Sequence, residues 1–408
     1  MVFGYRNVRY YLGTRVLTVL ATEMQAVAVA WQVYGLTHRP LDLGLVGLAQ
    51  FLPGILLFPI TGHTADRVPR QRILRACSVG FPACSLALLA LTMHGLHSVI
   101  PIYLVLAANG TVRAFNGPAG QAFLPLLVPA EHFPKAVAWN SSVFQISAIA
   151  GPVLGGLLYG WSGSPKVVYV CAVCGYLGAL LLLFSIRAPA VMRAHGSDWS
   201  EMALEGLRYI WRNRLILGAM SLDLFAVLLG GAVALLPVYA REILGVGAWG
   251  LGVLRSAPGV GAVITGLAVA HWPLRRRAGA VMLWSVAGFG LFTIVFGVSR
   301  NLALSLAALA LTGACDTVSV IVRHTLIQLS TPNEMRGRVS AVNVLFIGAS
   351  NEVGQFESGV TAHWFGTTPA VILGGIGAIV VVAVWAWLFP ELRRVNTLAN
   401  HAAEDGTP

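Results

Sequence analysis

Acidic and basic side chains stand inside several long apolar segments of this sequence. Glu23 lies near the middle of the first of these segments, and Arg15 precedes it by about two helical turns. A carboxylate in a low-dielectric environment binds a proton more readily than one in water. Glu23 is therefore a candidate for carrying protons or contacting a substrate, and Arg15 belongs to the same candidate site. An ion pair that only stabilises the fold is the alternative.

More charges of this kind occur in later apolar segments. Asp316 and Arg323 are seven residues apart, which places them on one face of a helix. Arg323 and the adjacent His324 could instead lie at the cytoplasmic end of that helix. Glu352 is expected deep in its segment, and Glu357 nearer the outside. Two further charges complete the set: Asp223 and Arg255. The sequence leaves the pairing of these charges open.

The elements that hold these charges are predicted from composition. Of the 408 residues, 57% are hydrophobic and only 11% are charged, whereas about 25% of residues are charged in ordinary soluble domains. A helix crosses a bilayer with roughly 20 apolar residues. We therefore predict an all-α integral membrane protein with twelve transmembrane helices, at 10–36, 42–63, 73–94, 98–121, 137–160, 166–186, 214–240, 249–272, 278–299, 301–325, 338–360 and 368–389.

An internal repeat divides these twelve segments into two sets of six. A shift of 203 residues superimposes the pattern P-x-E-x3-[KR]-x2-A-x-N at Pro129 on the same pattern at Pro332, with glycines at shared offsets after it. Such a repeat indicates two pseudo-symmetric six-helix bundles. The predicted divisions are an N-terminal bundle, a linker with a surface helix, a C-terminal bundle and a cytoplasmic tail: 1–186, 187–213, 214–390 and 391–408.

The linker and the basic residues indicate how the chain is oriented in the membrane. Glu201, Glu205, Arg208 and Arg212 share one helical face, which predicts a short helix at the membrane surface. With a cytoplasmic N-terminus, 19 Lys and Arg residues fall in cytoplasmic segments and 4 in outer loops. This asymmetry follows the positive-inside rule and predicts that both termini are cytoplasmic. It also explains the net charge of +11 without nucleic acid.

Three motifs indicate segments that could move or contact a ligand during function. The loop after the second segment places an acidic residue and arginines at a helix end: Gly62, Asp66, Arg67, Arg70 and Arg72. Ion pairs that break and re-form there would switch a gate. Alternatively, the basic residues only anchor the loop. Arg113, in the fourth segment, needs a partner or water, so it faces a polar cavity or pairs with a carboxylate. The fifth segment contains a proline and glycines that permit a kink and tight packing: Gly151, Pro152, Gly155 and Gly156.

Together these motifs resemble the signatures of the major facilitator superfamily. The first resembles its cytoplasmic gate motif, although Pro69 and Gln71 depart from the pattern. Arg113 and Gly117 resemble its R-x-x-x-G motif, implicated in proton coupling, and Gly151–Gly156 resembles the G-P-x-x-G-G motif of antiporters. The segments at 332–339 and 346–359 resemble the transmembrane secretion effector branch, which contains the bacterial enterobactin exporter. The resemblance covers essentially the whole chain.

The resemblance implies the major facilitator fold and a proton-coupled exporter in the bacterial cytoplasmic (inner) membrane. The implied cargo is a small amphipathic molecule such as a catecholate siderophore, and multidrug or macrolide efflux is the alternative. The expected partners are the substrate, the proton and the lipid bilayer, and the expected state is a monomer. A membrane-embedded enzyme is the alternative from another class; the sequence shows no metal-ligand cluster or nucleophile constellation for it.

Other chemistry finds little support in the sequence. The two lysines, Lys135 and Lys166, each follow a proline, so no Walker A loop is present and energy must come from an ion gradient, the substrate gradient or a separate subunit. The G-x-G-x-x-G match at Gly245 follows no strand, which argues against a dinucleotide site. Cys171 and Cys174 are expected to pack in the core rather than bind metal. We therefore expect no cofactor.

Overall fold

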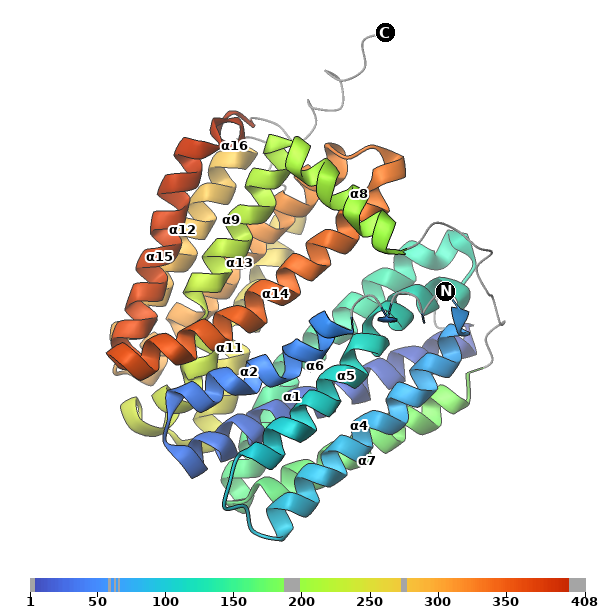
Figure 1. Ribbon diagram of the computed structural model, residues 1–408, viewed down its shortest axis with the longest axis vertical. Coiled ribbons are helices and arrows are strands. Elements are labelled where there is room, and N and C mark those ends of the chain that lie inside the picture. Colours follow the sequence, from blue (N-terminus) through green and yellow to red (C-terminus); the bar gives the residue numbers. More distant parts are fainter. Residues whose placement is uncertain are drawn as a thin grey trace. The chain divides into compact units, whose positions relative to one another are not determined.

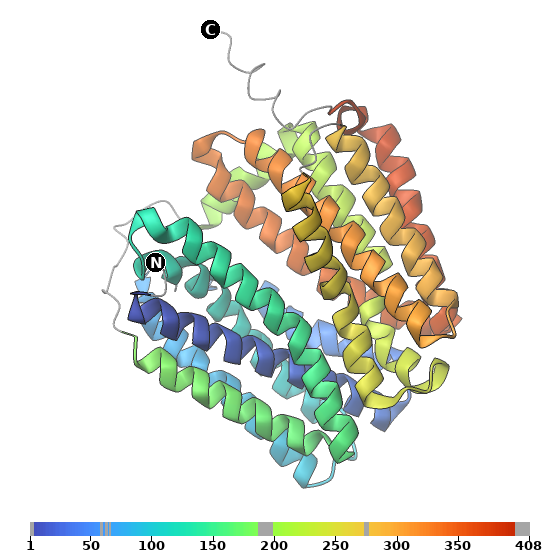
Figure 2. The same ribbon diagram turned by 180° about the vertical axis from the view of Figure 1, so that it is seen from behind.

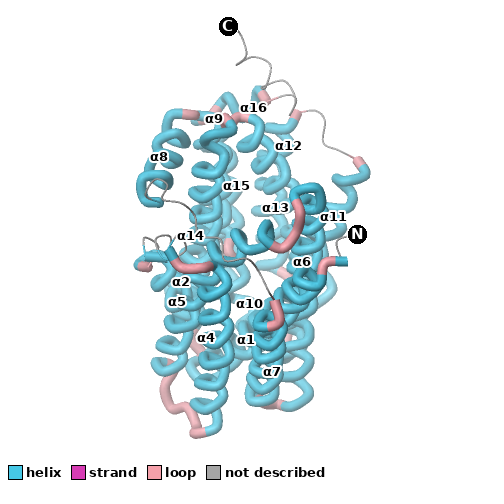
Figure 3. The backbone as a smooth tube through the Cα atoms, turned by 90° about the vertical axis from the view of Figure 1, so that its right-hand side faces the viewer, coloured by secondary structure: helices cyan, strands magenta, loops and turns pink. Residues whose placement is uncertain are grey.

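The chain is helical throughout the part that the structure describes. The computed structural model describes residues 4–57, 60–61, 64, 67–186, 199–272 and 277–395. Figure 3 shows only helices and loops among these residues. The helices are α1 (Arg6–Thr37), α2 (Pro40–Leu56), α4 (Arg70–Met93), α5 (Ile100–Phe123), α6 (Phe133–Ser162), α7 (Pro165–Phe184), α8 (Trp199–Arg212), α9 (Arg214–Gly230), α10 (Leu236–Val238), α11 (Gly247–His271), α12 (Ala278–Val298), α13 (Leu302–Leu329), α14 (Asn333–Phe365), α15 (Thr367–Leu388) and α16 (Pro390–Arg394).

The predicted apolar segments coincide with long helices. Among the described residues, nine helices are long and apolar enough to cross a membrane, and α2 is a shorter apolar helix. Two more long helices, α5 with 24 residues and α14 with 33, carry more polar side chains. The seventh segment is α9 continued by a 3₁₀ turn, by α10 and by a π-helical turn at Tyr239–Ile243. The predicted all-α membrane fold of twelve segments is confirmed.

The first compact unit contains Met1–Trp199 and Pro237–Ser256. In this unit α1 lies between α6 and α7 (Figure 2), α4 packs on α5 and α7, and α2 packs on α5. α2 and α5 are closely packed, because Gly110 of α5 lies against the backbone of Gln50 of α2. Residues 237–256 include the end of the seventh predicted span and the start of the eighth, yet they pack with the first six helices. The predicted division at the linker stays a prediction.

The second compact unit contains Ser200–Leu236 and Ala257–Pro408. Here α9 lies beside α14 and α15 (Figure 1), and α12 packs on α13 and α15. The end of α11 that belongs to this unit packs on α13 through glycines. Gly313 lies against the backbone of Pro258, and Gly261 lies against the carbonyl of Ala310. Small residues allow such backbone contact between membrane helices.

The 203-residue repeat appears in the helix ends as well as in the sequence. The 3₁₀ turn that follows α5 ends at Leu126, and α13 ends at Leu329. The helical segment that leads into α6 begins at Ala130, and α14 begins at Asn333. The same shift relates the two packing glycines, Gly110 and Gly313. The two units therefore use equivalent positions for equivalent helix contacts.

The linker helix α8 is held against the second unit. Residues 187–198, the first part of the predicted linker, lie outside the described residues. Glu205 of α8 forms an ion pair with Arg338 of α14, and the hydroxyl of Tyr209 donates a hydrogen bond to the carbonyl of Ser330 at 3.0 Å. Ile210 is fully buried in a cluster that includes Val339. Thus α8 docks where α13 ends and α14 begins.

Candidate functional site

Glu23 meets an arginine from a distant part of the chain inside the first unit. Its Oε2 atom lies 3.6 Å from Nη2 of Arg255 on α11. The two side chains are 28% and 27% exposed, so the pair is shielded on most sides but reachable. Glu23 is thus paired with a cation from α11. Protonation of its carboxylate would remove the attraction between the two side chains.

The glycine motif of α6 packs directly against Glu23. A Cβ added at Gly151 would lie 2.5 Å from Cβ of Glu23, and one added at Gly155 would lie 2.8 Å from Cα of Met24. Larger residues at these two positions would push α6 away from α1. The motif therefore sets the distance between α6 and the part of α1 that carries the carboxylate.

The same motif also contacts α11. A Cβ added at Gly156 would lie 2.6 Å from the carbonyl oxygen of Ala248 and 2.9 Å from Cα of Gly252. Gly252 in turn lies against the carbonyl of Pro152. The hydroxyl of Ser256 donates to the carbonyl of Ile149 at 2.6 Å, which adds a hydrogen bond between the two helices. The structure thus brings together Glu23, Arg255 and the G-P-x-x-G-G motif, from three helices.

Arg15 and Arg113 lie elsewhere in the first unit. The guanidinium of Arg15 lies over the ring of Phe144 at 5.1 Å, and its buried Nε atom has no hydrogen-bond partner among the described residues. Nη1 of Arg113 donates to Oε1 of Gln50 at 3.1 Å, which links α5 to α2. Neither arginine forms an ion pair within the part of the chain that the structure describes. Both could offer charge to a ligand.

The second unit contains one buried ion pair. Arg323 of α13 pairs with Asp223 of α9, and the two residues are 2% and 7% exposed. Asp316, two turns before Arg323 on α13, has no hydrogen bond or ion pair with any described residue. The repeat superimposes Arg113 on Asp316, so equivalent positions in the two units carry opposite charges.

Two carboxylates of α14, Glu352 and Glu357, have partners on the same helix. Nε2 of Gln355 donates to Oε2 of Glu352 at 3.2 Å. The hydroxyl of Thr361 donates to Oε1 of Glu357 at 2.6 Å. Each of these bonds spans about one turn of the same helix, so they orient the carboxylates without linking α14 to another helix.

The predicted cytoplasmic gate is only partly described. Gly62 and Asp66 lie outside the described residues, whereas Arg67 and Arg72 are exposed and Arg70 begins α4. Gln71, at one of the positions that depart from the family pattern, donates from Nε2 to the carbonyl of Ile186 at 2.6 Å. The role of this loop as a gate therefore stays a prediction.

A second polar cluster in the first unit was not predicted. The hydroxyl of Tyr34, near the end of α1, donates a hydrogen bond to Glu242 in the π-helical turn. His38 lies 4.0 Å from the same carboxylate, and Arg241 lies over the ring of Trp31 at 5.6 Å. The sequence signal was the adjacent pair of charges that follows an apolar segment. These contacts hold residues 237–243 against α1.

Helical bundles related by a 203-residue repeat, with paired charges inside apolar helices, define a transporter of the major facilitator class. The family model for transmembrane secretion effectors matches residues 9–405. The chain therefore belongs to the transmembrane secretion effector family of major facilitator transporters. No group of three or more metal-binding side chains occurs among the described residues.

Two relatives illustrate the family. The enterobactin exporter EntS of Shigella boydii serotype 4 (strain Sb227) is 27% identical over 390 residues, which cover 93% of this chain and 91% of the relative. The MFS-type transporter YfiS of Bacillus subtilis (strain 168) is 26% identical over 384 residues, which cover 91% of this chain and 90% of the relative.

Solved structures support the fold alone. A bacterial homologue of the human lysosomal transporter Spinster superimposes with a TM-score of 0.77 at 14% identity, covering 95% of this chain and 98% of that chain. A D-xylose–proton symporter superimposes with a TM-score of 0.69 at 16% identity, covering 94% of this chain and 98% of that chain. These superpositions therefore agree with the major facilitator fold.

Proposed function

We propose that this transporter exports a small amphipathic molecule, such as a catecholate siderophore, in exchange for protons by alternating access. The observation that carries the proposal is the Glu23–Arg255 ion pair beside the glycine motif of α6. The relatives named enterobactin exporter suggest the siderophore class. The protein acts as a monomer in the bacterial cytoplasmic membrane, with both termini in the cytoplasm.

The ion pair offers a simple way to couple protons to movement. While Glu23 is ionised, it attracts Arg255 and helps to hold α11 against α1 and α6. When the carboxylate takes up a proton, that attraction disappears, and the cation on α11 is left without its partner in a low-dielectric environment, which is unfavourable. Protonation therefore favours separation of α11 from α1 and α6, and loss of the proton favours their return.

Transport in everted membrane vesicles tests this proposal. We expect addition of the exported compound to dissipate a preformed proton gradient, measured with a proton-sensitive dye against a panel of catecholates and drugs. Glu23→Gln should abolish the proton movement, because a neutral amide cannot take up and release a proton as a carboxylate does. Glu131→Gln, which alters an exposed carboxylate outside the spans, is the matched control and should behave as wild type.

Two outcomes would contradict different parts of the proposal. If no compound in the panel moves protons through the wild-type protein, proton-coupled export of these classes is wrong. If Glu23→Gln retains full proton-coupled activity, Glu23 has no part in the coupling, although proton-coupled export itself is not contradicted. Arg255→Lys keeps the positive charge and should retain more activity than Arg255→Gln.

A further inference from the structure

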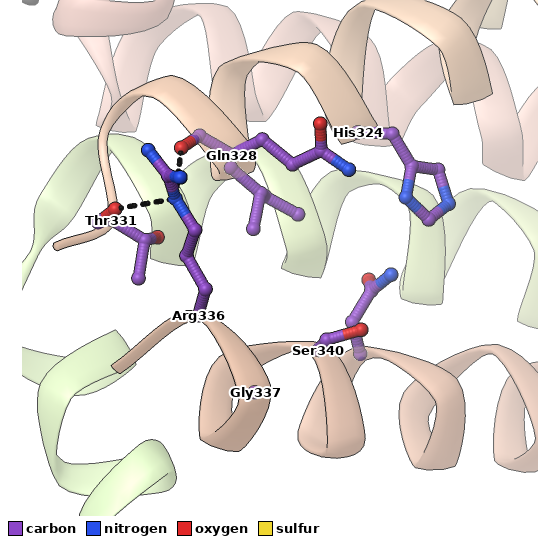
Figure 4. Close-up of a pocket in the computed structure, with 8 residues that line it drawn as sticks. His324, Gln328, Thr331, Arg336, Gly337 and Ser340 are labelled. Atoms are coloured by element: carbon purple, nitrogen blue, oxygen red, sulfur yellow. Dashed lines mark hydrogen bonds between the residues drawn. The ribbon is translucent and has the colours of Figure 1, made fainter. Parts of the chain in front are cut away.

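A polar cavity lies in the second unit, between the end of α13 and the beginning of α14. Its volume is about 470 Å³. Figure 4 shows the side chains that converge on it from the two helices and from the short loop that joins them. Most of the lining residues carry hydrogen-bonding side chains: His324, Gln328, Thr331, Arg336, Ser340 and Asn343.

Arg336 is fixed at the wall of this cavity. Its Nε atom donates to the carbonyl of Gln328 at 3.0 Å and to the carbonyl of Thr331 at 3.1 Å (Figure 4). These bonds use one of its five donor hydrogens, and the two terminal amino groups remain for other acceptors. No carboxylate is among the residues that line the cavity, so Arg336 gives it a positive charge.

Two side chains in the cavity wall, those of Asn343 and Thr331, are buried. Asn343 is 3% exposed and Thr331 is 2% exposed. The hydroxyl of Thr331 is buried and has no hydrogen-bond partner among the described residues. Buried polar groups are nearly always hydrogen-bonded in folded proteins. Asn343 lines the cavity, so a molecule that enters it can form hydrogen bonds with the amide.

The internal repeat shows that the fold does not need polar residues at three of the lining positions. In the first unit, 203 positions earlier, the residues equivalent to Thr331, Arg336 and Ser340 are Val128, Phe133 and Val137. Val128 belongs to a buried apolar cluster, and Phe133 packs against it. Three lining positions are thus apolar in one unit and hydrogen-bonding in the other, whereas Asn343 and His324 correspond to the polar residues Asn140 and Gln121.

We propose that this cavity binds an oxyanion of the phosphate class. The guanidinium of Arg336 and the donor groups of Gln328, Ser340 and Asn343 match an anion that offers several acceptor oxygens. Two sources share this chemistry: the headgroup of an anionic phospholipid, and a soluble phosphate or phosphate ester. A basic pocket between the ends of membrane helices is a recurring site for anionic headgroups.

Thermal unfolding of the purified full-length protein tests the proposal. Inorganic phosphate is titrated against chloride at equal ionic strength in detergent, and nanodiscs of phosphatidylglycerol are compared with nanodiscs of phosphatidylcholine. A ligand that binds the folded state and not the unfolded state raises the melting temperature, and the rise grows with the ratio of ligand concentration to Kd. We expect phosphate, phosphatidylglycerol or both to raise it for the wild-type protein.

Three variants locate the effect. Asn343→Leu replaces a buried amide with an apolar side chain of similar size, and Ser340→Ala removes an exposed hydroxyl, so both variants should fold. We expect Asn343→Leu to weaken apparent phosphate binding about tenfold, the effect of losing roughly one hydrogen bond to an anion. Asn140→Leu, at the equivalent position of the first unit, is the matched control and should bind as wild type.

The arms of the experiment separate the two sources. A response to inorganic phosphate that Asn343→Leu and Ser340→Ala weaken supports a soluble ligand. A response to phosphatidylglycerol alone, weakened by the same variants, supports a lipid headgroup. The proposal is overturned if neither raises the melting temperature, or if both variants respond as strongly as the wild-type protein.

Discussion

At the scale of single residues, the pairing of buried charges separates stabilising roles from functional ones. Arg323 and Asp223 are almost completely buried and face each other across α9 and α13. An ionised side chain inside a membrane is strongly unfavourable unless it is paired or hydrated. This pair therefore stabilises the second unit, whereas Asp316, which has no described partner, remains available for transport.

Replacing one member of the Arg323–Asp223 ion pair should destabilise the protein more than replacing Asp316. We expect Asp223→Asn to lower the free energy of unfolding by about 3–5 kcal/mol, because it leaves Arg323 buried without a counter-charge. Thermal unfolding in detergent, with size-exclusion profiles as a second measure, gives the change. Asp316→Asn is the matched control and should shift stability far less. Equal losses in the two variants would contradict the assignment.

The sequence predicted which residues carry charge inside the membrane, but not their partners. Asp316 and Arg323 share a helix face, and that spacing made them candidates for one site, yet Arg323 pairs with Asp223, 100 residues earlier. Glu23 likewise pairs with Arg255 rather than with Arg15. Periodicity gives the face of a helix on which a charge lies. It carries no information about which distant helix packs against that face.

At the scale of helices, glycines decide how closely α6 and α11 approach. Gly156 and Gly252 lie against each other's backbone in the first unit, where no side chain fits between the helices. The prediction that Gly151–Gly156 permits tight packing agrees with this contact. The contact also places Arg255, one turn further along α11, within reach of Glu23.

A methyl group at this contact should disturb transport. Gly252→Ala places a Cβ against the carbonyl of Pro152, so we expect the helices to separate and the transport rate in vesicles to fall by at least about tenfold. Gly266→Ala on the same helix meets open space and is the matched control. Transport by the two variants at equal expression is the measurement. A Gly252→Ala protein as active as the control would show that close contact is dispensable.

Helix positions were predictable, and helix ends less so. Apolar runs marked every span because lipid offers no hydrogen bonds to the backbone, which must satisfy its own within a helix. The segment predicted at 338–360 belongs to α14, which extends from Asn333 to Phe365. A helix can continue past the membrane into polar sequence, where hydropathy no longer marks it. The docking of α8 through Glu205 and Arg338 was also invisible, because it depends on tertiary contacts.

At the scale of the whole molecule, the distribution of basic residues predicts how the chain crosses the membrane. A C-terminal fusion to a fluorescent protein that matures only in the cytoplasm should fluoresce. Alkaline phosphatase, which is active only outside the cytoplasmic membrane, should be active when inserted at Gly163, between α6 and α7. The opposite pattern at both sites would reverse the predicted orientation.

The Glu23–Arg255 pair also bears on how the protein is made. When Glu23 has been synthesised, the 231 residues between it and Arg255 are still untranslated. At about 5–20 residues per second, the carboxylate waits roughly ten to fifty seconds for its counter-charge. During that interval the carboxylate lacks the cation that it meets in the folded first unit. The first unit is therefore completed only after residues 200–236 of the second unit have been synthesised.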